Sequence, residues 1–509
     1  MPSNVINHHL ERYLGWQDHL TKSIRDPVYG TIRFSEEEMR VIDSEVFHRL
    51  HRIRQNGMLY LVFPAATHTR FEHSLGVVHI AQSILTNLLV NSSVAARKST
   101  PTVASLKRAK AGQAINFAEL DNEQLDYIFR VTRLAALVHD LGHGPFSHTF
   151  DSFAPRGHQI KSLLERTQGV EHFSIFLESD PNKRIKHEIM SCVLFAYLWG
   201  QLPYDSDTIY DIAAVLLGRP EICPQKKFRP FVELIHDIIA SAPADADRMD
   251  YLERDSRSIG VNYGLYDRDR LLKSFLVYKE NSSEKNYDAF RLGVKCSGIR
   301  AVENFIQARF QLFVQIYYHK TSRAIDIMLK SIAELAKKET RDVFSWDDLE
   351  DFNHFIDIYQ ELSDDRFLRI LRGKDPDCRV EGKEINLLAQ RIFKRELWKR
   401  VYEGKPTRTE NIFKKLKTDF QNIDQGDLHF DKVDPKATKD FEDGAVLLSQ
   451  GNDGIYAKHH ERNWLSESSI TAALKNAEKE ISRIYLKKEY PPLLENLRTK
   501  AREYHNILF

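Results

Sequence analysis

Cysteine is scarce in this chain, and the four that occur are widely separated: Cys192, Cys223, Cys296 and Cys378. No two of them have the short spacing typical of zinc ligands or of a disulfide framework. This pattern argues against a disulfide-stabilised secreted domain and against a cysteine-based zinc finger. It predicts a reduced, cytoplasmic protein.

Long apolar runs, excess charge and repeats are also lacking. No uninterrupted hydrophobic stretch approaches the roughly 20 residues that a membrane-spanning helix needs. The N-terminal segment MPSNVINHHLERYLGW lacks the basic start and apolar block of a signal peptide. The formal net charge of +1 gives no overall attraction to nucleic acids or membranes. The sequence therefore predicts no membrane partner and leaves nucleic-acid binding to local patches.

The composition is that of an ordinary globular protein able to bury a large core. Of 509 residues, 42% are hydrophobic and 28% charged. Helical periodicity dominates and predicts helices over 71–89, 131–141, 187–200, 231–240, 302–335 and 468–489. Strand signals are confined to short stretches at 30–34, 275–280 and 290–294. We expect an all-α fold with small β-hairpins.

The composition shifts near residue 335, where the sequence becomes highly charged. We expect a core over residues 1–335, interrupted by a polar loop insertion at about 91–125. A charged helical region would follow over 336–509, with a regulatory or oligomerisation role. The length fits two to four domains or one large elaborated domain.

Four segments concentrate side chains that carry chemistry: HTRFEHSLG (68–76), LVHDLGHGPFSH (137–148), KHE (186–188) and DADRMDYLERD (245–255). Each has a purely structural explanation when taken alone. A single histidine on an apolar face is usually a hydrogen-bonded core residue, and a run of mixed charge is usually a solvated helix face. Their combination favours a functional site.

His139 and Asp140 stand side by side at the end of an apolar stretch. A buried charge is costly, so Asp140 needs a neighbouring cation, a hydrogen-bond network or a metal ion. Imidazole and carboxylate groups are ligands for Zn, Fe, Mn and Ni. Gly142 and the Gly144-Pro145 pair end the helix here, which places both candidate ligands at a helix end where they can reach one ion.

Other helices must supply the remaining ligands of such an ion. His73 and an aspartate near residue 247 are the natural candidates. Arg70 lies one turn before His73, so its guanidinium would lie beside the ion and would suit a phosphate oxygen.

The spacing of these residues resembles the HD superfamily of metal-dependent phosphohydrolases. The segments DPVYGTI (26–32), YLVFPAATHTRFEHSLGVVHIA (60–81), LVHDLGHGPFSHTFD (137–151) and YYHKTSRAIDIML (317–329) are similar to the dNTP triphosphohydrolases of that superfamily. The similarity is to the core of their sterile-alpha-motif/HD-domain branch, over roughly residues 24–330 and without the sterile-alpha-motif domain.

This resemblance implies an HD phosphohydrolase core that hydrolyses deoxynucleoside triphosphates to deoxynucleoside and triphosphate. It also implies a divalent transition metal (Fe, Mn, Zn or Ni) at the HD site and Mg on the substrate triphosphate. The family forms oligomers, so the resemblance implies a homo-oligomer, either a tetramer or a dimer.

The resemblance also implies roles for individual residues. The metal ligands would be His73, His139, Asp140 and Asp247, although spacing alone cannot separate Asp247 from Asp250. The catalytic group would comprise His143 and His148, with Asp151, His187 and Glu188 in support. The triphosphate would be bound by Arg70, Arg248, Arg309 and Lys320. The base and sugar would be contacted by Gln55, Tyr251, Asp255 and Tyr317.

The sequence departs from the family at several of these positions. Arg248 replaces a lysine, which keeps the charge but changes its geometry. Asn56 replaces a leucine beside the sugar. In the segment that holds the family's regulatory nucleotide, His48 and His51 replace a glutamine and an arginine. We therefore expect no activation by GTP through that route.

Three other functions stay open at this point. One is an HD-type phosphohydrolase or nuclease that acts on another nucleotide or on a nucleic-acid end. A second is a non-enzymatic, nucleotide-responsive interaction protein. The third is nucleic-acid binding through residues 391–418, where Lys and Arg alternate with aromatic residues. The structural explanation of that segment is an amphipathic helix pair with solvated cations.

Overall fold

The structure is a computed structural model. It describes residues 17–508 apart from 178–179, 242–243, 282–287, 339–343, 345, 377–381, 421–426, 434–446, 452, 459–467, 469, 471–472, 475–480 and 488–490.

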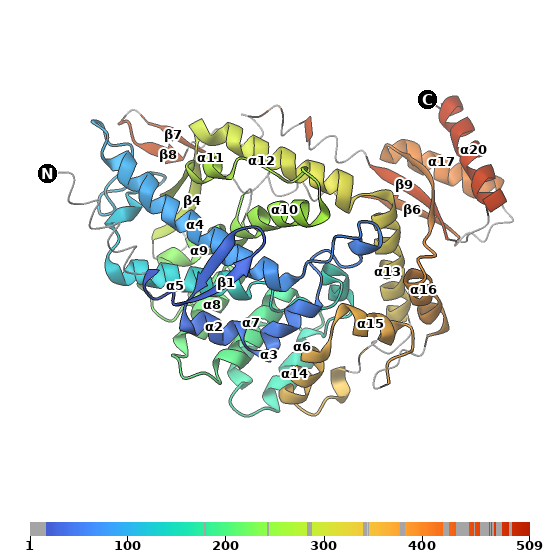
Figure 1. Ribbon diagram of the computed structural model, residues 1–509, viewed down its shortest axis with the longest axis horizontal. Coiled ribbons are helices and arrows are strands. Elements are labelled where there is room, and N and C mark those ends of the chain that lie inside the picture. The colour runs from blue at the N-terminus through green and yellow to red at the C-terminus, as the bar shows by residue number, and fades with distance from the viewer. Residues whose placement is uncertain are drawn as a thin grey trace.

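Helices make up most of the protein (Figure 1), which confirms the predicted fold class. In chain order they are α2 (Glu36–Ile42), α3 (Glu45–His48), α4 (Arg70–Ala96), α5 (Asn122–Val138), α6 (Gly157–Glu165), α7 (His187–Trp199), α8 (Asp207–Leu217), α9 (Arg229–Ala240), α10 (Ala246–Ile259), α11 (Arg268–Leu272), α12 (Ile299–Leu312), α13 (Lys320–Lys338), α14 (Phe352–Glu361), α15 (Asp364–Leu371), α16 (Lys383–Phe393), α17 (Pro406–Asp419) and α20 (Pro491–Leu508).

The strands form small sheets. An antiparallel hairpin joins β1 (Lys22–Asp26) to β2 (Gly30–Phe34). A four-stranded sheet has the order β3 (Phe275–Asn281), β4 (Asp288–Lys295), β7 (Leu447–Gln450) and β8 (Tyr456–Lys458). A three-stranded sheet has the order β5 (Lys399–Gly404), β9 (Ser482–Leu486) and β6 (Leu428–Lys432). The three predicted strand segments coincide with β2, β3 and β4.

Most predicted helices are present, with two corrections. The prediction of one helix over 302–335 is wrong, because a π-helical turn at Phe313–Tyr317 separates α12 from α13. The prediction of a helix over 468–489 is wrong for residues 482–486, where β9 lies between β5 and β6, while 469, 471–472, 475–480 and 488–489 lie outside the described residues. All five residues of β9 are buried, and periodicity alone cannot distinguish a short buried strand from a buried helix segment.

Helix α4 runs through the main core and packs against α5 and α10. A capping box between Thr69 and Glu72 starts it, which sets Arg70 and His73 in its first turn. By length and composition α4 is apolar enough to cross a membrane, but 67% of its apolar window is buried inside the protein. The helix therefore has the packing of a core helix.

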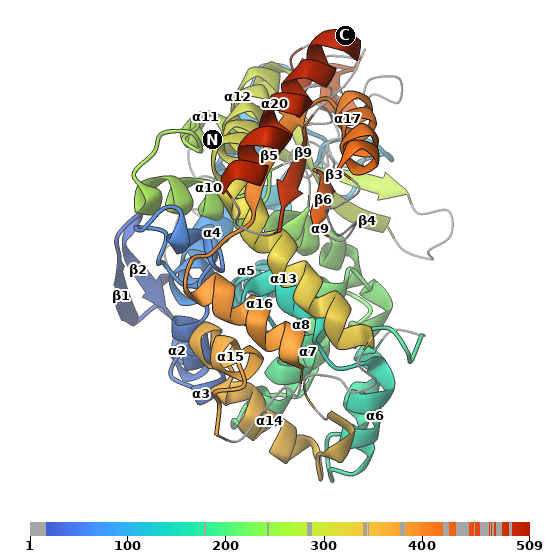
Figure 2. The same ribbon diagram turned by 90° about the vertical axis from the view of Figure 1, so that its right-hand side faces the viewer.

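The main hydrophobic core continues past residue 335. Phe352, Phe355 and Phe367 of α14 and α15 belong to the same buried cluster as the residues of α4 and α5. A second, smaller core lies between β5, β6, β9, α17 and α20 at one end of the molecule (Figure 2). The division near residue 335 stays a prediction, while the packing joins α14 and α15 to the core that carries the site.

Candidate metal centre and active site

Three helices bring the predicted metal ligands together. His73 lies in the first turn of α4, Asp247 in the first turn of α10, and His139 and Asp140 directly after α5. Gly142 permits this arrangement, since a Cβ there would lie 2.2 Å from the carbonyl oxygen of His187. Only glycine lets the backbone of α7 approach so closely.

The four side chains converge on one point. The Nε2 atom of His73 lies 3.0 Å from Asp247 Oδ1 and 3.5 Å from Asp140 Oδ2. The Nε2 atom of His139 lies 3.5 Å from Asp140 Oδ1 and 3.8 Å from Asp247 Oδ1. Two imidazoles and two carboxylates thus surround a space of the size that a metal ion needs.

The other ring nitrogen of each histidine is already engaged. His73 Nδ1 donates to Asp250 Oδ2 at 2.7 Å, and His139 Nδ1 donates to the carbonyl oxygen of Ala136 at 2.8 Å. Both buried Nε2 atoms make no hydrogen bond within the described part of the chain. This is the arrangement that orients histidines as metal ligands, so the residues present fit a divalent ion. The donor set suits Zn, Fe, Mn or Ni equally.

The electrostatics of the cluster also favour a cation. Burial opposes protonation of His73, but the carboxylates of Asp247 and Asp250, which face its two ring nitrogens, and the charge of Asp140 outweigh it and raise the pKa of His73 to about 10. Burial likewise opposes ionisation of Asp247, yet His139 and His73 hold the pKa of that carboxyl well below its usual range. Negative charge that retains a proton on a buried imidazole would equally stabilise a metal ion.

A buried ion-pair network holds His73 through its Nδ1 atom, and sequence reasoning did not identify this network. Arg254 donates to both oxygens of Asp250, at 2.9 and 3.0 Å, and to Asp26 at 2.9 Å. Gly76 makes room for these groups, since a Cβ there would lie 1.9 Å from Asp250 Oδ1 and 2.3 Å from Arg254 Nη2. The structure therefore separates the two aspartates: Asp247 faces the site and Asp250 holds the histidine.

Donors also hold the carbonyl oxygens of the turn after α5. Arg49 is fully buried and donates to the carbonyl oxygens of Leu141 and His143, at 2.5 and 2.7 Å. Tyr359 Oη donates to the carbonyl oxygen of Gly142 at 2.8 Å. The turn that carries the ligands is thus fixed by side chains from both halves of the chain.

The predicted catalytic histidines lie beside Asp140. His143 Nε2 is 3.3 Å from Asp140 Oδ1, and its ring stacks on that of His187 at 3.8 Å between centroids. His187 Nδ1 in turn lies 3.4 Å from Glu188 Oε2. Burial, together with the charges of Arg70 and His187, lowers the pKa of His143. The side chain of His148 lies outside the described residues, and its role stays a prediction.

A cavity of about 350 Å³ opens onto this cluster. Its lining includes ten of the predicted residues, namely Gln55, Arg70, His139, Asp140, His143, His187, Glu188, Asp247, Arg248 and Tyr251. Two cations flank it: Arg70 pairs with Asp140, and Arg248 pairs with Asp245. A small cavity lined by both carboxylates and guanidiniums suits a phosphate chain bound through a metal ion.

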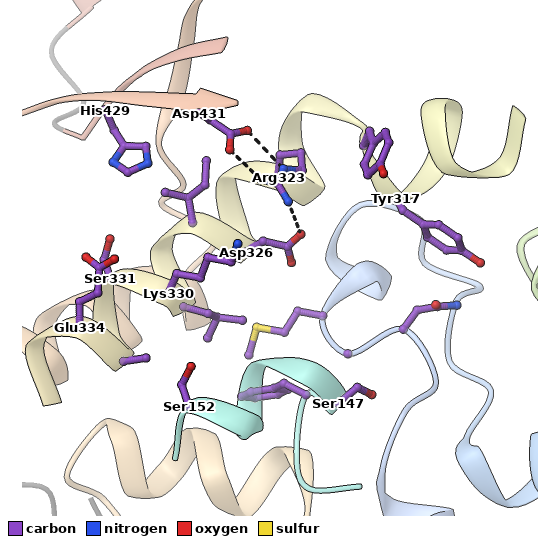
Figure 3. Close-up of a pocket in the computed structure, with 18 of the residues that line it drawn as sticks. Ser147, Ser152, Tyr317, Arg323, Asp326, Lys330, Ser331, Glu334, His429 and Asp431 are labelled. Carbon is purple, nitrogen blue, oxygen red and sulfur yellow. Dashed lines mark hydrogen bonds and ion pairs between the residues drawn. The ribbon is translucent and has the colours of Figure 1, made fainter. Parts of the chain in front are cut away.

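A larger cavity of about 620 Å³ adjoins the first, and Gln55 lines both. Figure 3 shows Tyr317 on one side of it and the Arg323–Asp431 ion pair on another. Tyr317 Oη donates to Asp255, which also accepts from Asn56 Nδ2 at 2.8 Å. Of the predicted base and sugar residues, Gln55 therefore lines both cavities, Tyr251 the smaller one and Tyr317 the larger one.

Sequence reasoning missed one member of this group, and three predicted residues lie away from the cavities. His68 Nε2 donates to Asp255 at 2.6 Å, and the segment HTRFEHSLG contained it without a role. Arg309 reaches the site through Tyr251 Oη, at 3.0 Å. Lys320 and Asp151 line neither cavity among the described residues. The carbonyl oxygen of Lys320 accepts from Tyr485 Oη.

Residues 391–418 do not form the expected amphipathic helix pair, because β5 lies between α16 and α17. Trp398 is 4% exposed, and Tyr402 and Phe413 pack on the small C-terminal core. Phe393 is 54% exposed and carries the Arg372 guanidinium 3.7 Å above its ring. Three of the four aromatic side chains thus pack inward, which argues against a base-stacking groove.

Comparison with known proteins gives the same assignment as the motifs. A search against protein-family models finds no match. The deoxynucleoside triphosphate triphosphohydrolase SAMHD1 of Mus musculus is 30% identical over 414 residues, which cover 76% of this chain and 55% of that protein. The SAMHD1 homolog of Dictyostelium discoideum is 29% identical over 391 residues, or 75% of this chain and 60% of that protein. The chain is a relative of the HD-domain dNTP triphosphohydrolases.

Further similarities extend beyond these HD-domain dNTP triphosphohydrolases. An HD domain-containing protein of Acanthamoeba polyphaga mimivirus is 26% identical over 389 residues, covering 74% of this chain and 72% of that protein. The crystal structure of a hypothetical protein from Aquifex aeolicus has 26% identity and a TM-score of 0.60, covering 94% of this chain and 99% of that one. The chain spans little more than half the length of the mouse SAMHD1 protein.

Proposed function

We propose that this protein is a metal-dependent phosphohydrolase that hydrolyses deoxynucleoside triphosphates to deoxynucleoside and intact triphosphate. The observation that carries the proposal is the cluster of His73, His139, Asp140 and Asp247, in which both histidines aim an unbonded Nε2 atom at two carboxylates. Three members of this cluster, His139, Asp140 and Asp247, line a cavity that is also lined by two guanidinium groups.

The chain's own residues divide the work of such a reaction. A divalent ion bound by the four ligands would supply Lewis-acid charge to the reacting phosphate. Arg70 and Arg248 would bind the phosphate chain and orient it. Stacking on His187 fixes the ring of His143, and burial lowers its pKa, so His143 would stay neutral and orient a reacting group by a hydrogen bond. His148 is proposed, from the resemblance, as the proton-transferring group.

Tyr317 and Asp255 would select the sugar. Tyr317 lines the larger cavity and donates a hydrogen bond to Asp255, which supports this role. A 2′-hydroxyl beside the tyrosine ring would either clash with it or lie buried without a hydrogen-bond partner.

Mg bound to the substrate triphosphate and a homo-oligomeric assembly are parts of the same proposal. Light scattering tests the oligomeric state.

The test is a product analysis with defined metals. The protein is incubated with each dNTP and each rNTP in the presence of Mg and one of Mn, Fe, Zn or Ni, and the products are resolved by ion-exchange chromatography. We expect deoxynucleoside and triphosphate in equal amounts. The double variant His139→Ala/Asp140→Ala should lose both the bound metal and the activity while keeping its helical circular dichroism.

Other outcomes would contradict the proposal. Nucleoside monophosphate and pyrophosphate would indicate cleavage of the α–β anhydride bond instead of the bond between the 5′-oxygen and the α-phosphorus. Inert nucleotides together with shortened oligonucleotides would support a nuclease. Undiminished metal content in the double variant would show that the metal site is assigned to the wrong residues.

A further inference from the structure

A buried carboxylate from the C-terminal half of the chain joins two loops of the candidate active site. Asp364 is the first residue of α15, and its side chain is 1% exposed. Its Oδ1 atom accepts the backbone N–H of Phe146 at 2.8 Å, and its Oδ2 atom accepts the backbone N–H of Arg54 at 3.0 Å. One carboxylate therefore ties the loop after the HD pair to the segment that carries Gln55.

The loop that Asp364 holds is conformationally strained. Phe146 and Ser147 have φ values of 57° and 55°, in the left-handed region that residues with a side chain rarely adopt. Such a conformation persists only where the surroundings hold it. The bond to Asp364 holds the N–H of Phe146, and the ring of Phe146 packs 5.7 Å from that of Phe367 on the same helix.

The strained loop leads directly to the substrate-binding groups. Ser147 Oγ accepts from Arg70 Nε at 3.2 Å. The same hydroxyl lies 3.3 Å from the carbonyl oxygen of Gln55 and 3.4 Å from that of Arg54. The position of Ser147 thus sets the relative placement of Arg70 and Gln55, which line the cavity above the metal cluster.

We propose that Asp364 is a positioning residue, which clamps residues 53–56 and 143–147 together so that Arg70 and Gln55 face the substrate. It is not a catalytic residue, since it lines neither cavity among the described residues. Its contribution to substrate binding rests on the proposed function. The clamp itself can be tested without any substrate.

The chain supplies a matched control for this test. Asp365 is the next residue on the same helix, its side chain is 78% exposed, and it lies 3.6 Å from the Arg54 guanidinium. Asp364→Asn keeps the shape of the side chain but replaces one acceptor oxygen with an amide NH₂ group. One of the two backbone N–H groups therefore loses its acceptor. Asp365→Asn makes the same chemical change outside the clamp.

The first measurement is hydrogen–deuterium exchange on the full chain without nucleotide. In the wild type, the amides of Arg54 and Phe146 should exchange much more slowly than exposed loop amides. In Asp364→Asn, peptides covering 52–58 and 143–150 should exchange about tenfold faster or more, while a peptide from α9 is unchanged. Asp365→Asn should match the wild type. Unprotected Arg54 and Phe146 amides in the wild type would overturn the proposal even if the variant fails to fold.

The second measurement is metal content and steady-state kinetics on the same samples. Asp364→Asn should retain the wild-type metal content and show a KM for dNTP raised about tenfold, with kcat changed less than about threefold. Ser147→Ala should raise KM similarly while the Arg54 and Phe146 amides stay protected. Equal kinetics in Asp364→Asn and Asp365→Asn would refute the positioning role. If the protein hydrolyses no dNTP, the proposed function is refuted. The clamp is then tested by the hydrogen–deuterium exchange measurement alone.

Discussion

Gly76→Ala is the smallest change expected to disturb the metal centre. Gly76 lies in α4 one turn after His73, and a Cβ there would lie 1.9 Å from Asp250 Oδ1 and 2.3 Å from Arg254 Nη2. An ordinary contact begins near 3.4 Å, so the carboxylate must move by about 1.5 Å. Both neighbours are buried and engaged, and neither is free to turn away. The movement would break the 2.7 Å bond between Asp250 and His73 Nδ1.

The expected energies can be worked from this geometry. Disruption of a buried ion pair costs about 3–5 kcal/mol. Replacement of a glycine inside a helix by alanine stabilises the helix by about 1 kcal/mol, because alanine has the higher helix propensity. The free energy of unfolding of the metal-free protein should therefore fall by about 2–4 kcal/mol. Loss of the group that orients a ligand histidine should weaken metal binding about 10- to 100-fold.

Two assays check these values. Urea unfolding in excess chelator gives the free energy of unfolding, and competition with a chromophoric chelator gives the metal dissociation constant. Gly200→Ala is a suitable control, because Gly200 caps the end of α7 and a Cβ there would lie 3.2 Å from the Ala196 carbonyl oxygen and 3.9 Å from that of Tyr197, far less crowded than at Gly76. If Gly76→Ala is too unstable to purify, Asp250→Asn should show the same weakened metal binding. A Gly76→Ala protein with wild-type stability and metal affinity would refute the reasoning.

Two further predictions concern sugar selection and pH. Wild-type protein should prefer dATP over ATP in kcat/KM by roughly 10- to 100-fold, and Tyr317→Ala should bring the ratio towards one; equal wild-type rates would exclude this role for Tyr317. Burial raises the pKa of Asp211 from 3.8 to about 6, although hydrogen bonds from Cys223 and Tyr127 oppose the shift. The folded state therefore binds a proton more tightly than the unfolded state, and this residue's contribution to stability falls as the pH rises from about 4 to 6. Between pH 4 and pH 7, the free energy of unfolding of Asp211→Asn should rise by about 2–3 kcal/mol relative to that of the wild type. Urea titrations measure this difference, and a difference that does not change with pH would contradict the raised pKa of Asp211.

Local features of the structure were predictable because neighbouring residues determine them. The glycines after α5 predicted its C-terminal end, whereas its start, capped by Asp121 and Gln124, lies nine residues before the predicted start at 131. The adjacency of His139 and Asp140 at that helix end is likewise a property of the local chain. The motif similarity to HD-domain proteins rests on these same short segments.

The errors occurred where tertiary contacts outweigh local pattern. Residues 482–486 have a pattern compatible with a helix, yet two flanking strands complete a sheet there and bury every residue of β9. Likewise, Asp247 and Asp250 are three residues apart on one helix and chemically identical. Only the position of His73 determines that one faces the metal site and the other supports the ring.

Residue types and their local spacing predicted which side chains could bind a metal or phosphates, and that helices carry them. How those side chains are held depends on contacts between distant parts of the chain. Asp364 contacts Phe146 across 218 residues of sequence, and Arg254 contacts Asp26 across 228. Bonds of this kind leave no periodicity or spacing in the sequence, because they depend on how whole helices pack. Only the folded chain brings together the carboxylates, guanidiniums and glycines that orient the metal ligands.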